Sequence, residues 1–456
     1  MEKWIEVFFA VKKRSLDGRT NAVVKGALFM LVSSLLGNLI RLGLVIGLTR
    51  YFSKEEFGVW ATITSLAAIF AYGDFGITNA LRNRLSQLKD AGIDGMRKAK
   101  SFFYSSIIFS AFIGLLVAIL IILVSRFISF DFLFKTNNLM LKQQGTNIIL
   151  LIQFLIFLNI PLSMGLACFF SFNESRYSAI FFFFQSLLSA LVVLVFALSD
   201  LGIFAIITSY FSMIIIINGV GTFYFLRIRG WLGHIFSLRE IISDTKELIS
   251  LGIKFMGYQF SYSFVQNSGT VLASSLLGLN MAAEFNIVQK LYGFISGIYQ
   301  SIFNPIWGGY AEAYARKDWI WCKRTLNGSI AISSGIFIAA IALLLFFGQH
   351  MLSIVAGINY SYDRVLFLLL GFTSLFSILF STGSTYLSAT SRIDLLLISM
   401  IITSFVVVLI SRYLVSQMEI AGIALATSVV WFVLMIIVTY RSYSLIGNKL
   451  RSKPKV

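Results

Sequence analysis

The feature that most constrains this chain is a succession of about twelve apolar segments. A hydrocarbon core about 30 Å thick is crossed by roughly 20 apolar residues in a helix, and each segment is long enough. Inside lipid the backbone must bond within its own segment, so we expect an all-α polytopic membrane protein. The expected limits are 24–49, 57–80, 101–126, 147–171, 178–198, 202–226, 251–278, 284–306, 326–347, 363–388, 393–415 and 420–440.

The distribution of charge gives the orientation of these segments. Only 12% of the 456 residues are charged, against roughly 25% in soluble chains. The net charge of +17 would suit a nucleic-acid-binding protein, but the Lys and Arg residues lie between apolar segments and not in a soluble domain. We therefore predict no nucleic-acid partner. Basic loops mark the cytoplasmic side, which predicts that both termini are cytoplasmic.

The segments divide into two halves. We expect six-helix bundles over 1–226 and 251–441, an amphipathic cytoplasmic linker over 227–250 and a basic cytoplasmic tail over 442–456. A faint repeat supports this, because LTRYFSKEEFG from Leu48 aligns with LLGLNMAAEFN from Leu276. Parallel repeats of this kind place a substrate site between the halves.

Nothing in the sequence indicates catalysis. Cys168 and Cys322 are too few and too scattered for a disulfide framework or a metal site, and His234 and His350 are isolated. No loop is long enough for a soluble catalytic domain. We predict that the protein is not an enzyme and carries no cofactor or metal.

Polar residues recur at helical spacing within several apolar segments. An unsatisfied amide in hydrocarbon costs several kcal/mol, so the Gln and Asn stripes favour a water-filled cavity. For segment 363–388, packing through small residues is an equal alternative. The stripe of the first segment is Ser34, Asn38 and Arg41, and that of the seventh is Gln259, Ser263, Gln266, Thr270 and Ser274. The stripe of the eighth is Asn286, Lys290, Gly293, Gly297 and Asn304, with Gln300 close by.

Three charges fall well inside apolar segments: Arg41, Asp74 and Lys290. A charge at this depth costs about 2.5–3.5 kcal/mol and usually lines a polar space. Lys25, Lys254 and Arg364 lie near segment ends, where long side chains reach water. Counting along the helices puts Arg41 about 12 Å and Lys290 about 9 Å from the outer surface, so both could face one space. Asp74, about 25 Å from that surface, is too deep to pair with Arg41. It is a coupling or gating residue, or it caps local backbone.

Several motifs resemble a known family. GLTRYFSKEEFGVW at 47–60, DFGITNALRNRLS at 74–86 and FNPIWGGYAEAY at 303–314 are similar to the Wzx-type polysaccharide flippases. These belong to the multidrug/oligosaccharidyl-lipid/polysaccharide (MOP) exporter superfamily. The resemblance implies a V-shaped, MATE-like pair of bundles in the bacterial inner membrane. It implies alternating access coupled to H⁺ or Na⁺, with the polysaccharide polymerase and the chain-length regulator as partners. The implied substrate is an undecaprenyl-diphosphate-linked oligosaccharide, such as an O-antigen repeat unit, flipped to the periplasmic leaflet.

The residues and the resemblance give one hypothesis and three rivals. Arg41 and Lys290 would hold the diphosphate, because cations with amides suit an anionic, sugar-bearing ligand. A multidrug cation antiporter of the same superfamily would need an acidic residue, for which Asp74 is the candidate. The other rivals are a membrane polymerase or glycosyltransferase and a non-transporting scaffold. In the flippase hypothesis, the sugars would lie along Asn38, Gln259, Gln266, Gln300 and Asn304.

Overall fold

The computed structural model is built of helices. It describes residues 18–71, 76–89, 92–125, 130–172, 174–233, 236–303, 306–357, 360, 362–390 and 392–451, and within these ranges no strand occurs. The helices are α2 (Gly18–Tyr51), α3 (Lys54–Phe70), α4 (Ile77–Leu88), α5 (Gly92–Ser125), the short 3-10 helix η1 (Phe130–Leu133), α6 (Leu139–Ser171), α7 (Ser175–Leu198), α8 (Gly202–Ile228), α9 (Leu238–Leu276), α10 (Leu279–Phe303), α11 (Ile306–Ala315), α12 (Trp319–Ala356), α13 (Arg364–Ala389) and α14 (Ile393–Arg451).

The expected polytopic membrane fold is confirmed. Eight of the described helices, α2, α5, α6, α7, α8, α12, α13 and α14, are long and apolar enough to cross a membrane. α14 is two helices joined at Glu419, whose φ of 49° breaks the helix. α3, α9 and α10 are shorter or more polar and correspond to the remaining expected segments. The expected segment 57–80 differs, because α3 ends at Phe70 and α4 is a separate helix.

Local signals in the sequence set several helix starts. Ser53 and Glu56 form a capping box at the start of α3, and Ser237 and Glu240 form another at the start of α9. The hydroxyl and backbone N–H of Ser237 donate to the Glu240 carboxylate and hold the pKa of that carboxyl below its usual value. α9 therefore begins inside the predicted linker 227–250 and continues without a break into the seventh expected segment.

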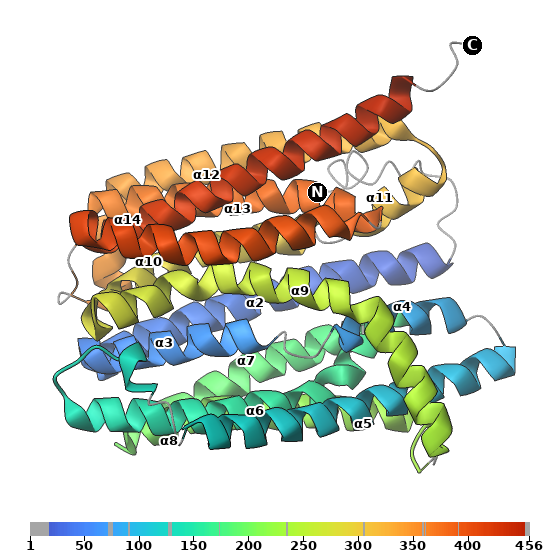
Figure 1. Cartoon of the computed structure of the whole chain (residues 1–456), viewed down its shortest axis with the longest axis horizontal. Helices are drawn as coiled ribbons and strands as arrows, with labels where there is room; N and C mark the ends of the chain where they lie inside the picture. The colour runs from blue at the N-terminus through green and yellow to red at the C-terminus, as the bar shows by residue number, and fades with distance from the viewer. Residues whose placement is uncertain are drawn as a thin grey trace.

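The helices pack as two groups that share one core at one end (Figure 1). We call α2–α8 the N-terminal group and α9–α14 the C-terminal group; the finer domain limits stay a prediction. The shared core combines Leu48 and Phe57 with Ile287 and Val355. A second core lies within the C-terminal group around Trp431, and a third lies in the N-terminal group around Phe103.

The joined end, at the left of Figure 1, is where the α2–α3 turn meets the α9–α10 turn. Lys54 and Glu284 form a salt bridge at 2.5 Å. The hydroxyl of Thr49 donates to the Val355 carbonyl at 2.6 Å. Gly58 touches the Leu279 backbone so closely that a Cβ would lie 2.1 Å from the carbonyl oxygen. The two segments that align as a sequence repeat therefore contact each other here.

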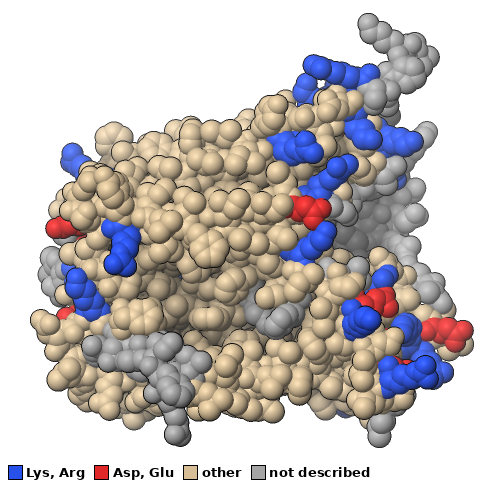
Figure 2. Space-filling model, viewed as in Figure 1, with Lys and Arg blue, Asp and Glu red and all other residues tan. Residues whose placement is uncertain are grey.

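The open end, at the right of Figure 1, is bridged by the first part of α9. Asp244 is fully buried, pairs with Lys98 and accepts a hydrogen bond from Ser101 at 2.5 Å. Arg84 pairs with Glu247 at 2.6 Å. These contacts hold the start of α9 against α4 and α5 of the N-terminal group. Lys and Arg side chains gather at this end (Figure 2).

Candidate functional site

Arg41 lies on α2 and faces α7. Its Nε and Nη2 atoms are each 3.4 Å from the Ser186 hydroxyl, and the side chain stays exposed. Gly37, one turn earlier, leaves room for this contact, since a Cβ there would lie 3.2 Å from the same oxygen. Ser186 donates its own proton to the Phe182 carbonyl. The Arg41 guanidinium therefore keeps donors available for a ligand. No pattern in the sequence singled out Ser186.

Lys290 lies on α10 and is exposed, although α10 packs among α2, α3, α9, α12 and α13. Lys290 is therefore exposed on a helix that has neighbours on several sides. The helices that carry Lys290 and Arg41, α10 and α2, pack against each other. Arg41 precedes the end of α2 by ten residues and Lys290 follows the start of α10 by eleven. Both lie about 15–17 Å from the joined end, deeper than the sequence count suggested.

Asn38 and Gln300 extend this site along α10. A Cβ on Gly297 would lie 2.5 Å from Asn38 Nδ2, so the glycine allows Asn38 to approach α10 closely. Lys290, Gly293 and Gln300 are exposed and, with Gly297, lie on one side of the helix. A Cβ on Gly293 would meet no atom within 4 Å. This side of α10 is therefore open at Lys290, Gly293 and Gln300 and covered by Asn38 at Gly297.

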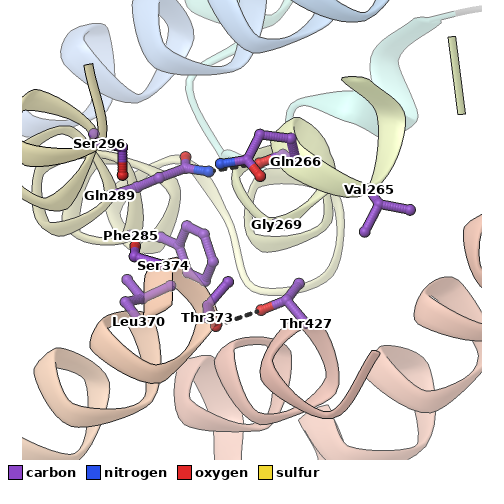
Figure 3. Close-up of a pocket in the computed structure, with 11 residues that line it drawn as sticks. Val265, Gln266, Gly269, Phe285, Gln289, Ser296, Leu370, Thr373, Ser374 and Thr427 are labelled. Carbon is purple, nitrogen blue, oxygen red and sulfur yellow. Dashed lines mark hydrogen bonds between the residues drawn. The ribbon is translucent and has the colours of Figure 1, made fainter. Parts of the chain in front are cut away.

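Gln259 and Gln266 make their contacts in other parts of the molecule than Arg41 does. Gln259 accepts a hydrogen bond from Asn79 of α4 at 2.9 Å, which connects α9 to the N-terminal group. Gln266 lines a pocket within the C-terminal group, between α9, α10, α13 and α14 (Figure 3). Its Oε1 atom is buried without a hydrogen-bond partner. Asn304 and Asp74 lie outside the described residues.

The pocket around Gln266 is polar and uncharged. The side-chain amide of Gln289 donates to the backbone carbonyl of Gln266 at 2.7 Å and accepts a hydrogen bond from the Thr270 hydroxyl at 3.0 Å. Across the pocket, the hydroxyls of Thr373 and Thr427 lie 3.4 Å apart (Figure 3). The sequence stripes did not single out Gln289, because it lies on the flank of α10 beside Lys290.

The expectation that whole stripes line a cavity is wrong for several members. Ser263 is buried and donates to the Ala68 carbonyl of α3 at 2.7 Å. Asn286 is 1% exposed and donates to Thr270 at 3.3 Å. These side chains join helices to one another. Periodicity alone cannot separate a polar packing contact from a wet surface, because both recur at the same spacing.

Residues 23–306 match the model of a family described as "Polysaccharide biosynthesis protein". This match spans more than half of the chain. The chain belongs to the polysaccharide biosynthesis protein family. This family match confirms the resemblance that the sequence motifs indicated. No curated protein matches the chain.

Solved structures show which fold this polysaccharide biosynthesis protein has. An inward-facing multidrug resistance MATE family transporter of the MOP superfamily superposes with a TM-score of 0.70 at 14% identity, covering 94% of this chain and 99% of that one. The outward-facing form of a MATE family transporter gives 0.68 at 15% identity, covering 96% and 98%. A MOP superfamily transporter from Pyrococcus furiosus, described by a reverse polarity of its binding pocket, gives 0.65 at 14%, covering 96% and 100%.

The fold is therefore that of the MATE and MOP transporters. The long apolar helices and this fold indicate a multi-pass membrane protein. Within this fold, Arg41 and Lys290 are two exposed cations at one level of the contacting helices α2 and α10, and Asn38 and Gln300 add amides. Such a lining can hold phosphate oxygens and sugar hydroxyls.

Proposed function

We propose that this polysaccharide biosynthesis protein flips an undecaprenyl-diphosphate-linked oligosaccharide, of the O-antigen repeat-unit type, across the bacterial inner membrane. The observation that carries the proposal is the pair of exposed cations, Arg41 and Lys290, at the same depth on contacting helices of the two groups. Moving a bare diphosphate through hydrocarbon is prohibitive, so its path needs a charged lining. Guanidinium offers a fork to phosphate oxygens, and ammonium offers a compact charge.

The distribution of charge supports an orientation with the open end in the cytoplasm. Loops and helix ends there carry Arg84, Arg97, Lys246, Lys323 and Arg451, among others (Figure 2). Basic residues of this kind favour the cytoplasmic side. Both termini are then cytoplasmic, and the headgroup enters from that side. The isoprenoid tail stays in lipid, and rocking of one helix group against the other moves the headgroup across.

The rival function is export of cationic drugs, which would favour acidic groups in the interior space. Among the described residues with resolved side chains, Asp and Glu lie near helix ends or in the first part of α9, as Glu284, Asp200 and Asp244 do. This placement favours an anionic substrate. A coupling or gating role for Asp74, H⁺ or Na⁺ as coupling ion, and assembly with the polymerase and chain-length regulator remain predictions.

The test is complementation of a flippase-deficient strain, with the lipid-linked glycan assayed in each leaflet. The double variant Arg41→Ala, Lys290→Ala loses at least one charge-assisted contact to the substrate at each residue. We expect the loss of both contacts to lower export by about 100-fold. The control Lys323→Ala removes an exposed charge at the open end and exports normally. Both proteins insert at wild-type levels. Normal glycan export by the double variant would refute the proposed site.

A further inference from the structure

A second pocket of the C-terminal group lies between α10, α11, α12 and α13, near the open end. It contains three buried hydroxyls for which the structure shows no hydrogen-bond partner. They belong to Tyr299, Tyr310 and Ser329, which are 3%, 1% and 3% exposed. Buried polar groups are nearly always hydrogen-bonded, so three unpaired hydroxyls that line one pocket call for a ligand or water that supplies the missing bonds.

The pocket also has an aromatic wall. The rings of Tyr299 and Phe303, one turn apart on α10, stack with centroids 4.0 Å apart and planes at 16°. Tyr310 is held in place by the edge of Tyr386, with ring centroids 5.4 Å apart. An apolar wall with a few fixed polar groups is the usual lining of a small-molecule site. A pyranose ring has matching chemistry, because its C–H faces are apolar and its rim carries hydroxyls.

The hydrogen-bonding groups complement those of a sugar. The Tyr310 and Ser329 hydroxyls can donate. Thr382 donates to the Leu379 carbonyl at 2.6 Å and Thr385 donates to the Ser381 carbonyl at 2.7 Å, which leaves their oxygens as acceptors. Among the described residues that line this pocket, none is charged. A carboxylate would be desolvated there without a counter-ion, so the pocket favours a neutral ring.

The position of the pocket connects it to the cation pair. Gln300, exposed, lines the pocket and lies ten residues beyond Lys290 on α10, a separation of about 15 Å along the helix. A ligand with its diphosphate at Lys290 could place a sugar of the attached oligosaccharide beside Gln300.

We infer that this pocket is a saccharide subsite selective for an uncharged pyranose of the transported oligosaccharide. The inference rests on the proposed function and refines its substrate class. The cation pair would hold any lipid diphosphate, whereas the pocket would decide which glycan is accepted. Tyr310 and Ser329 are then specificity-determining residues that contact the sugar.

The experiment measures dissociation constants for the full-length protein in nanodiscs. The three probes are undecaprenyl diphosphate, the same lipid carrying glucose, and the same lipid carrying glucuronic acid. We expect the glucosyl lipid to bind at least tenfold more tightly than the bare lipid and the glucuronyl lipid to show no such gain. The double variant Tyr310→Phe, Ser329→Ala reduces the glucosyl gain about tenfold or more, because a hydrogen bond contributes about one decade, and leaves the bare lipid unaffected.

Two further variants keep the outcomes distinct. Ser442→Ala removes a buried hydroxyl of the same group that is already bonded to Val438, and we expect it to leave all three constants unchanged. Gln300→Ala tests the exposed rim if the double variant folds poorly, and it should also reduce the glucosyl gain.

A glucosyl gain that survives both pocket changes, or an equal gain for the glucuronyl lipid, would overturn the subsite. Failure of Arg41→Ala, Lys290→Ala to weaken binding of the bare diphosphate would instead overturn the proposed function.

Discussion

The two ends of the helix assembly differ in how they connect the two groups. At the joined end, one hydrophobic core draws on both groups, and Lys54–Glu284, Thr49–Val355 and Gly58–Leu279 connect them directly. At the open end each group has its own core, and the first part of α9 provides the bridge. The polar face of α10, with Lys290 and Gln300, lies between these ends.

This difference indicates which contacts a rocking motion must break. Opening the joined end separates the α2–α3 turn from the α9–α10 turn. The start of α9 is fixed to the N-terminal group through Asp244 and Glu247, so it would stay with that group. The hinge would then fall within α9, beyond Gly252, whose carbonyl oxygen a Cβ on Gly76 would meet at 2.1 Å.

The largest expected effect comes from Gly58→Ala. A Cβ 2.1 Å from the Leu279 carbonyl oxygen forces two backbones apart, and overpacking of this kind costs about 1–3 kcal/mol or more. We expect thermal unfolding of the purified protein at a clearly lower temperature. Gly43→Ala is the matched control, because a Cβ there meets nothing within 4 Å and alanine favours the helix. Equal stability of the two variants would contradict close packing at the joined end.

A smaller effect is expected from the Lys54–Glu284 pair, whose side chains are 27% and 11% exposed. A double-mutant cycle with Lys54→Ala and Glu284→Ala should give a coupling energy of about 1–2 kcal/mol, since the pair is partly shielded from water. Spin labels on the α2–α3 and α9–α10 turns should report a greater mean separation in either single variant. A coupling energy near zero would mean that the Lys54–Glu284 pair does not hold the joined end together.

The smallest effect is expected for Lys254–Asp394 near the open end, which has the same chemistry in a different setting. Its side chains are 59% and 69% exposed, so solvent screens the 2.7 Å contact. The corresponding cycle should give about 0.5 kcal/mol or less, and less still at high salt. A coupling as large as that of Lys54–Glu284 would mean that burial does not distinguish the two ends.

Hydropathy and loop charge predicted the fold class well, because lipid forces the backbone into helices of fixed minimum length. They did not predict the break between α3 and α4 or the continuity of α9 through the expected linker. Helix ends depend on local capping and tertiary contacts that hydropathy does not measure, such as the Ser237–Glu240 box.

The candidate site was predicted in part. Arg41 and Lys290 stood out because a charge in an apolar segment is rare, and the structure places both on accessible surfaces. Ser186, Tyr310 and Ser329 carried no such signal, since Ser and Tyr within helices are common packing residues. Their significance depends on which hydroxyls remain unbonded, and only the three-dimensional contacts reveal that.

The proposed function requires that the exposed side of α10 be reached from the cytoplasm, and thiol accessibility tests this most directly. Gly293→Cys, in a background with Cys168 and Cys322 replaced by alanine, places a thiol between Lys290 and Gln300 on the exposed side of α10. Ile287→Cys, in the shared core, is the buried control. We expect a membrane-impermeant thiol reagent to modify the residue 293 thiol in inside-out vesicles and to leave the residue 287 thiol intact. Modification of residue 293 from the periplasmic side alone, or from neither side, would contradict the account.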